Sequence, residues 1–325
     1  MATYKEIKGT SIEVVSSDPS NPVLGQIWYN TTSQTLKGEE FSSLGSWATG
    51  GALPVGKSYL AGCGTQTAGL GFGGYTGPPS TNLATSEEYN GSSWTAGGTM
   101  GTARKRLAGC GTQTAALGFG GMPPTTTATE EYNGSSWTAG GALTTARQDL
   151  GGAGTQTAGL AFGGSNPSKS ETEEYNGSSW TNGGALPTAT SGIAGAGTQT
   201  AGLGFGGYTT TFAVATYEYD GSSWTAGGSM TTGRSKLGGT GTQTSGLAFG
   251  GTVSGGGRTA ATEQYDGSSW AAATSMSTLR NNSPGGAGDT SAGLAFGGRT
   301  PSTDATTATE EFAGAGPATV TISGS

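Results

Sequence analysis

Two aromatic motifs recur along the 325-residue chain at a shared period, and this repeat limits the fold more than any other feature. Phe-Gly-Gly begins at Phe72, Phe119, Phe162, Phe205, Phe249 and Phe296. Six tryptophans keep step with it: Trp47, Trp94, Trp137, Trp180, Trp224 and Trp270. Neighbouring copies lie 43–47 residues apart, a period typical of propeller blades with four strands. The repeat excludes a random low-complexity chain, although Gly and Pro number 65 and 12, a content typical of disorder when no period is present.

One repeat, residues 147–186, predicts four short strands and no helix. Small residues run to residue 154, and residues 159–164 alternate so that Leu160 and Phe162 share one face. A third strand is predicted at 172–175. Asn176-Gly177 then predicts a tight hairpin turn into the strand that holds Trp180, because both residues tolerate a positive φ. Four short strands per repeat predict an all-β blade.

The first strand of each repeat is built almost entirely of small residues. Examples are Ala61-Gly62-Cys63-Gly64 and Gly151-Gly152-Ala153-Gly154. Glycine weakens a strand, and it commonly marks a place where two backbones approach closely. We therefore expect these strands to meet around the axis of a ring, with Leu, Phe, Tyr and Trp filling the wider spaces between blades.

The order of residues within a unit resembles the kelch repeat. A basic residue precedes the small-residue strand, a hydrophobic strand ends in Gly-Gly, and Glu-x-Tyr-Asn/Asp and Trp follow, over about residues 53–316. The resemblance implies a β-propeller of four-stranded antiparallel blades.

Seven blades are favoured, in one continuous propeller. A degenerate N-terminal blade at 11–52 precedes six kelch-like blades at 53–325, and residues 319–322 serve as the outer strand of the last blade. The alternative is six blades, with the strand of Trp47 closing the ring.

The N-terminal region resembles the opening of kelch-like virion proteins of marine tailed bacteriophages. The resemblance rests on residues 14–19, Val-Val-Ser-Ser-Asp-Pro, and residues 25–30, Gly-Gln-Ile-Trp-Tyr-Asn. It implies a structural or receptor-contact protein of a virion, made in the host cytoplasm, such as a tail fibre, a spike or a capsid decoration, with other virion proteins as partners. Assembly as an oligomer or in several copies is compatible with this interpretation. Residues 1–10 are a possible attachment segment.

Composition excludes several other classes of protein. The chain has no His, which removes His-based catalytic triads and His metal sites. Its net charge of −7 argues against a nucleic-acid partner. No apolar run approaches the roughly 20 residues of a membrane helix, and the first residues do not resemble a signal peptide. Phosphate-loop, zinc and EF-hand patterns are missing, so no cofactor or metal is predicted.

Length variation between repeats points to one face of the predicted ring. The spacing from Phe to the next Tyr or Phe of the third strand varies from 13 to 17 residues, whereas the other spacings are nearly constant. In an antiparallel blade these loops emerge beside the links to the next blade. Variable loops on a rigid scaffold commonly bind ligands. The alternative is that loops without a function drift in length.

Five basic residues open the first strands on this same face: Lys57, Arg104, Arg147, Arg234 and Arg280. Thr190 takes the sixth place. One interpretation is a ring of cations at the channel mouth that binds carboxylates or sulfates of a glycan. The other is that each cation pairs with a neighbouring blade, for example with a Glu.

Loop aromatics are the other candidate ligand-binding residues. Tyr75, Tyr208 and Phe212 could stack on sugar rings, or pack over the blade edges.

Paired glutamates such as Glu173-Glu174 cannot share a proton, since neighbouring strand residues point to opposite faces. We expect one of each pair to be solvated and the other to be paired or to protect a sheet edge. Cys63 and Cys110 occupy a position that elsewhere holds Ala or Thr, so a small buried residue is predicted there.

These observations favour a non-enzymatic virion surface protein that binds host-surface polysaccharide or protein through its variable loops. An intracellular kelch-type scaffold that binds a peptide is the alternative, and a glycosidase is a remote one. The missing His excludes the His-ligated copper site of kelch-like oxidases.

Overall fold

The computed structural model describes residues 12–19, 27–42, 44–78, 80–165, 167–314 and 316–322. These residues form seven four-stranded sheets and one 3₁₀ turn, Ser254–Gly256, and they contain no α-helix. The chain divides into two compact units, one of residues 46–314 and one of residues 1–45 with 315–325.

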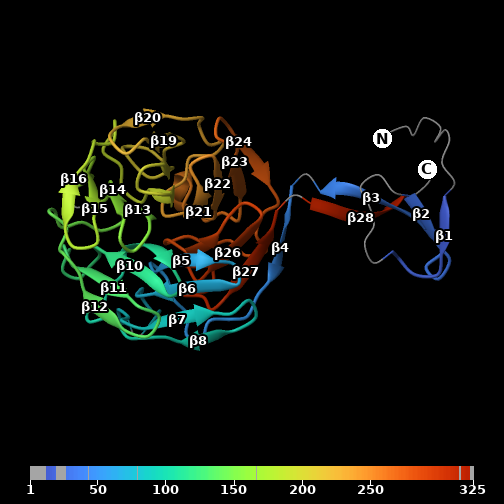
Figure 1. The fold of residues 1–325 in the computed structure, drawn as a ribbon, viewed down its shortest axis with the longest axis horizontal. Coiled ribbons are helices and arrows are strands. Elements are labelled where there is room, and N and C mark those ends of the chain that lie inside the picture. The colour runs from blue at the N-terminus through green and yellow to red at the C-terminus, as the bar shows by residue number, and fades with distance from the viewer. Residues whose placement is uncertain are drawn as a thin grey trace. The chain divides into compact units, whose positions relative to one another are not determined.

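The larger unit is a ring of six antiparallel blades (Figure 1). The first three blades are β5–β8 (Ala61–Thr65, Ala68–Phe72, Ser86–Tyr89, Trp94–Ala96), β9–β12 (Ala108–Thr112, Ala115–Phe119, Thr129–Tyr132, Trp137–Ala139) and β13–β16 (Gly151–Gly154, Gly159–Phe162, Thr172–Tyr175, Trp180–Asn182). The others are β17–β20 (Ala194–Gly197, Gly202–Phe205, Thr216–Tyr219, Trp224–Ala226), β21–β24 (Gly238–Thr242, Ser245–Phe249, Thr262–Tyr265, Trp270–Ala273) and β25–β27 (Gly285–Gly288, Ala292–Phe296, Thr309–Ala313) with β4 (Ser46–Thr49). We name each blade by its innermost strand.

The ring closes after six blades because β4 completes the last of them. β4 pairs with β27, with Trp47 opposite Phe312, and the innermost strand β25 packs against β5. Seven four-stranded sheets are present, as expected in number, but their arrangement is that of the alternative prediction, in which the strand of Trp47 closes the ring. Residues 319–322 do not supply the outer strand of the last blade, since β28 (Gly316–Ile322) pairs with β3 (Thr35–Ser42).

The smaller unit holds the seventh sheet, in the order β1-β2-β3-β28. β1 (Glu13–Val15) and β2 (Ile27–Asn30) are strands as predicted, yet they pair in parallel, unlike neighbouring strands of a ring blade. Beside β2, the carboxylate of Asp18 accepts hydrogen bonds from Lys37 Nζ, Asn30 Nδ2 and Trp28 Nε1, which lower the pKa of Asp18 to about 2. Residues 1–11, including the possible attachment segment, lie outside the described residues.

The hydrophobic core lies between the blades. In five of six clusters, the second-strand Leu and Phe of one blade pack against the Tyr and Trp of the next, as Phe119 does with Trp180 at 5.0 Å between ring centroids. In the sixth cluster Phe312 takes the place of the Tyr, and Trp47 packs against it. The Trp180 indole also donates a hydrogen bond of 3.0 Å to Thr129 Oγ1 of the preceding blade. The predicted filling of the spaces between blades by large side chains is confirmed.

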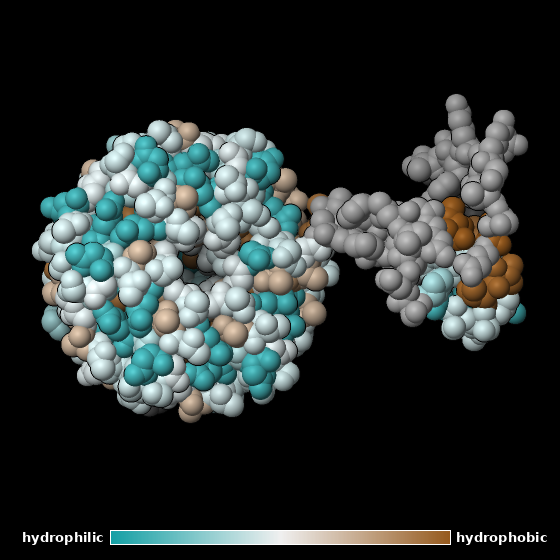
Figure 2. All heavy atoms as spheres, viewed as in Figure 1, coloured by the Kyte–Doolittle hydropathy of each residue, from teal (hydrophilic) through white to brown (hydrophobic). Residues whose placement is uncertain are grey.

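The small-residue strands line the axis, as predicted. A Cβ built on Gly195 of β17 would lie 2.4 Å from the carbonyl oxygen of Gly152 in β13. Real Cβ atoms do not approach an oxygen so closely, so only glycine lets these two innermost strands meet. A hollow remains at the centre of the ring (Figure 2).

Candidate functional site

The two faces of the ring carry different connections. One face holds the loops between second and third strands and the links from each fourth strand to the next blade; we call it the variable face. Its second-to-third-strand loops span 73–85, 120–128, 163–171, 206–215, 250–261 and 297–308. The opposite face, which we call the uniform face, holds the short turns between first and second strands and, in the five blades from β5 to β24, between third and fourth strands. The predicted confinement of loop-length variation to one face is confirmed.

The five basic residues predicted to ring the channel mouth are buried instead. Lys57, Arg104, Arg147, Arg234 and Arg280 are each at most 1% exposed. Each forms an ion pair within its own blade; the partners in chain order are Glu87, Glu130, Glu173, Glu263 and Glu310. The prediction of an anion-binding ring formed by these residues is therefore wrong. The alternative interpretation placed the partner, for example a Glu, in a neighbouring blade. The partner is a Glu, but it lies in the same blade as the cation.

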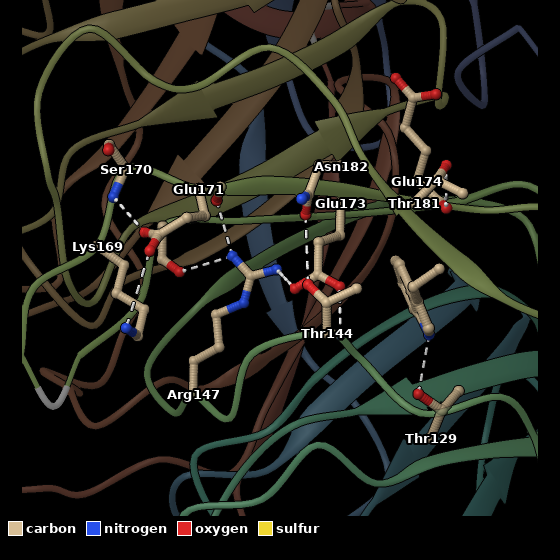
Figure 3. A network of polar contacts seen from close by, with 12 residues as sticks. Thr129, Thr144, Arg147, Lys169, Ser170, Glu171, Glu173, Glu174, Thr181 and Asn182 are labelled. Carbon is tan, nitrogen blue, oxygen red and sulfur yellow. Dashed lines mark hydrogen bonds and ion pairs between the residues drawn. The ribbon is translucent and has the colours of Figure 1, made fainter.

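The environment of Arg147 shows the contacts that a buried guanidinium makes at this position (Figure 3). Nη2 lies 2.5 Å from Glu173 Oε1, and Nη1 donates to the backbone oxygens of Glu171 at 2.7 Å and Gly163 at 3.3 Å. The other oxygen of Glu173 accepts the backbone N–H of Thr144 at 2.6 Å. Burial lowers the pKa of Arg147, and the charge of Glu173 opposes that change. The pair joins the link before the first strand to the second and third strands of the same blade.

The β17 blade lacks both members of this pair. Thr190 takes the place of the cation, and Tyr217 takes the place of the carboxylate; both are buried. Removing one partner alone would leave an uncompensated buried charge, which is strongly destabilising. The joint replacement indicates that the ion pair acts as one structural unit.

The second central residue of the third strand is a glutamate in five blades, and it too has a hydrogen-bond partner. The expectation that one glutamate of each pair is solvated is therefore wrong. Four tyrosine hydroxyls donate to it across the blade interface, from Tyr132 to Glu88 at 2.6 Å, Tyr175 to Glu131 at 2.5 Å, Tyr219 to Glu174 at 2.5 Å and Tyr265 to Glu218 at 2.6 Å. Tyr89 and Glu311 form a fifth such bond. At the sixth interface both members change, to Gln264 and Phe312. The carboxylate and the hydroxyl are therefore also lost together.

These tyrosines predict a loss of stability in alkali. Burial, followed by the hydrogen bond to Glu, raises the pKa of Tyr89, Tyr175, Tyr219 and Tyr265 to about 12, whereas unfolded tyrosine titrates near 10. From pH ~10 upward the unfolded chain loses protons that the folded ring retains. Denaturant titrations at several pH values should show the free energy of unfolding falling between pH ~10 and ~12.

A double variant provides the control for this pH dependence. Tyr175→Phe with Glu131→Gln copies the pair found at the sixth interface. The free energy of unfolding of this variant should fall less steeply with pH, by the contribution of one tyrosine. An unfolding free energy that stays constant up to pH ~12 would contradict the assignment.

A glutamine that sequence reasoning did not single out joins five of the six blades to the preceding blade. Gln156 Nε2 donates to the backbone oxygens of Ala116 at 3.2 Å and Tyr132 at 2.6 Å in the preceding blade. The repeated Thr-Gln-Thr motif at residues 155–157 was the available signal. Gln66, Gln113, Gln199 and Gln243 make equivalent contacts.

The predicted loop aromatics lie on the variable face, in two places. Tyr208 and Phe212 stand edge to face, with ring centroids 5.4 Å apart, and Tyr208 is 41% exposed. They line an open groove of about 630 Å³ together with Thr211, Thr231 and Val253. Tyr75 lies elsewhere, with Lys105 Nζ 4.2 Å from its ring centroid. The structure thus brings two of the three aromatics together.

A rim of residues that sequence reasoning missed surrounds the channel mouth on the variable face. Each lies two residues after the position of the basic residue and has a positive φ of 51–60°: Tyr59, Arg106, Asp149, Gly192, Lys236 and Asn282. Backbone hydrogen bonds of 2.7–3.0 Å join these positions from blade to blade into a closed hoop, which Ser283 N–H completes. The positive φ costs an L-residue roughly 1–2 kcal/mol, and nothing in the sequence pattern predicts it.

The rim side chains form a charged cluster beside the axis. Arg106 Nη1 lies 3.2 Å from Asp149 Oδ2. The Arg106 guanidinium carbon and Lys236 Nζ lie 4.7 and 5.5 Å from the centroid of the Tyr59 ring. Asp149 is 8% exposed, and its Oδ1 atom has no hydrogen-bond partner among the described residues.

The innermost strands form the wall of the channel below this rim. Cys63 and Cys110 lie there as buried free thiols, which confirms the prediction of a small buried residue. Burial raises the pKa of Cys63 to about 12 and that of Cys110 well above its usual value. A thiol rather than a thiolate is the form present near neutral pH, so neither cysteine is activated as a nucleophile.

Charge is distributed unequally between the two faces. Six cations of the ring lie outside the buried pairs, and all six are on the variable face: Lys105, Arg106, Lys169, Lys236, Arg258 and Arg299. Asp149, Glu171 and Asp304 share that face. Over the described part of residues 46–314, the uniform face carries Asp220, Asp266 and Asp289 and no cation. An anionic ligand is therefore attracted to the variable face, although the whole chain is acidic.

Comparison of the sequence with models of protein families gives no match, and comparison with curated proteins gives none either. Within the described residues, no helix has the length and apolar character needed to span a bilayer. The groove, the rim and the distribution of charge are the features of the variable face that bear on ligand binding.

Proposed function

We propose that this protein is a non-enzymatic, kelch-type propeller of a virion surface, which binds a host-surface polysaccharide through its variable face. The groove beside Tyr208 and Phe212 carries this proposal. Aromatic rings can pack on the apolar faces of sugars, and the hydroxyls of Thr211 and Thr231 can exchange hydrogen bonds with sugar hydroxyls.

The carboxylates support a binding role over a hydrolytic one. Glycosidases use two carboxyl groups on either side of the scissile bond. Here the first glutamate of a pair, such as Glu173, is held in a buried ion pair, and the second, such as Glu174, accepts a tyrosine hydroxyl. Both have structural partners that a catalytic role would have to displace.

Placement on a virion rests on the resemblance of residues 14–19 and 25–30 to phage proteins; residues 20–26 lie outside the described part of the chain. Other virion proteins are the expected attachment partners, through residues 1–10 or the uniform face. Assembly as an oligomer or in several copies stays a prediction.

A glycan array tests the binding function. The wild-type protein should bind a subset of bacterial surface saccharides, and the double variant Tyr208→Ser with Phe212→Ser should lose most of the signal, because the aromatic surface of the groove is removed. Val214→Ser provides the control, since Val214 is 40% exposed in the same loop and does not line the groove. An array without any bound saccharide, or equal binding by the double variant, would overturn the proposal.

A further inference from the structure

We propose that the channel mouth on the variable face is a second ligand site, in which Arg106 and Lys236 bind the carboxylate of an acidic sugar. The site is separate from the groove at Tyr208. It deepens the proposed function, and it rests on that function for the class of ligand.

The side chains of the rim are not needed to build the rim. The hoop is made of backbone N–H and C=O groups alone, and Gly192 takes its place in it without a side chain. Glycine adopts a positive φ without strain, so it would suit all six positions. Five of the six nevertheless carry side chains, four of them charged or aromatic. Residues held in strained conformations cluster at functional sites. The rim side chains therefore favour a binding role over a purely structural one.

The cluster has more positive than negative charge. Arg106 and Lys236 approach the same ring, that of Tyr59, from different blades. Arg106 pairs with Asp149, whereas Lys236 forms no ion pair with any described residue. A Cβ on Gly192 would lie 3.1 Å from Lys236 Cγ, so the missing side chain at this position gives the Lys236 side chain room at the rim. An anionic group that enters here meets one unpaired cation and one that shares its charge with a single carboxylate.

Asp149 supplies the feature that distinguishes a sugar acid from a simple anion. Its side chain is 5% exposed. Oδ2 contacts Arg106 and Ser165, whereas Oδ1 is buried without a hydrogen-bond partner, in a residue that lines the channel mouth. A buried acceptor without a partner is costly, and a hydroxyl donor would satisfy it. A ligand with a carboxylate and neighbouring hydroxyls fits both requirements.

The backbone argues against a peptide at this place. Peptides commonly bind by pairing their main chain with unpaired strand groups. At the rim, the N–H groups of Tyr59, Arg106, Asp149, Gly192 and Lys236 already donate within the hoop. A peptide would therefore find few main-chain donors.

Isothermal titration calorimetry of the full chain with glucuronate, glucose and a glutamate-rich peptide tests the site. We expect glucuronate to bind with an affinity that falls as salt rises, and glucose to bind about tenfold more weakly or not at all. Lys236→Met should weaken glucuronate binding about tenfold. Lys236→Gln is the second variant, should the first fail to fold.

Lys105→Met is the matched control, because it removes one cation from the same face while leaving the rim side chains intact. Glucuronate binding should persist in that variant. Equal weakening by Lys105→Met and Lys236→Met would overturn the site in favour of a diffuse positive face. Binding of the peptide without binding of glucuronate, or no binding of glucuronate, would overturn the ligand class. Failure of the proposed function would be seen in a different experiment, as a glycan array on which the protein binds no saccharide through the groove.

Discussion

Replacing Arg147 with alanine is expected to lower the free energy of unfolding by about 3–5 kcal/mol, the largest single effect that the ring predicts. The guanidinium is fully buried and holds Glu173 together with two backbone oxygens. Its removal leaves Glu173 buried with only a backbone N–H for a partner. Denaturant-induced unfolding, followed by tryptophan fluorescence, measures the loss.

The double variant Arg147→Thr with Glu173→Tyr separates pairing from packing. It copies Thr190 and Tyr217, the pair that the β17 blade uses in the same places. Since no charge is left unpaired, the double variant should be more stable than either single variant. If the double variant lowers the free energy of unfolding by as much as the two single variants together, the two residues act independently, contrary to the structure.

Gly195→Ala is the second substitution with a large expected effect. The added Cβ would meet the Gly152 backbone oxygen at 2.4 Å, so the innermost strands of two blades would have to separate. Overpacking of this kind typically costs about 1–3 kcal/mol, and the rigid ring gives little room for relaxation. Chemical denaturation should show the loss in the free energy of unfolding.

Gly77→Ala is the matched control for this substitution. A Cβ on Gly77 meets only Asp304 Cβ, at 3.5 Å, and its φ is not positive. Its stability should stay within about 0.5 kcal/mol of the wild type. Equal effects at both positions would mean that close approach at the axis is not what requires glycine at 195.

The sequence predicted most of the ring, because each blade repeats the same physical requirements. The period of Phe72, Trp94 and their equivalents predicted blades of four strands. The small residues at 151–154 predicted that the first strand of each blade lies nearest the axis. The closure was harder to predict. Residues 39–47 look like one continuous part of a unit, yet β3 and β4 belong to different sheets. Pairing between strands more than 250 residues apart leaves no local signal.

The candidate site was predicted less well than the fold. The identity of a basic residue such as Arg147 does not reveal whether it is buried in an ion pair or exposed to a ligand. Its partner, Glu173, lies 26 residues away, and only the joint change in the β17 blade reveals the coupling. The rim at Arg106 and Lys236 depends on a positive φ at non-glycine residues, which no composition or period encodes. Tyr208 and Phe212 were found because aromatic residues in loops are informative without any further context.

Hydrogen–deuterium exchange with and without purified host-surface polysaccharide tests the central claim, that the two faces of the ring have different tasks. We predict slower exchange in peptides of the variable face, covering 97–107, 206–215 and 232–238. We predict unchanged exchange in the turns of the uniform face at 133–136, 176–179 and 220–223. Protection confined to those turns, or spread equally over both faces, would contradict the account.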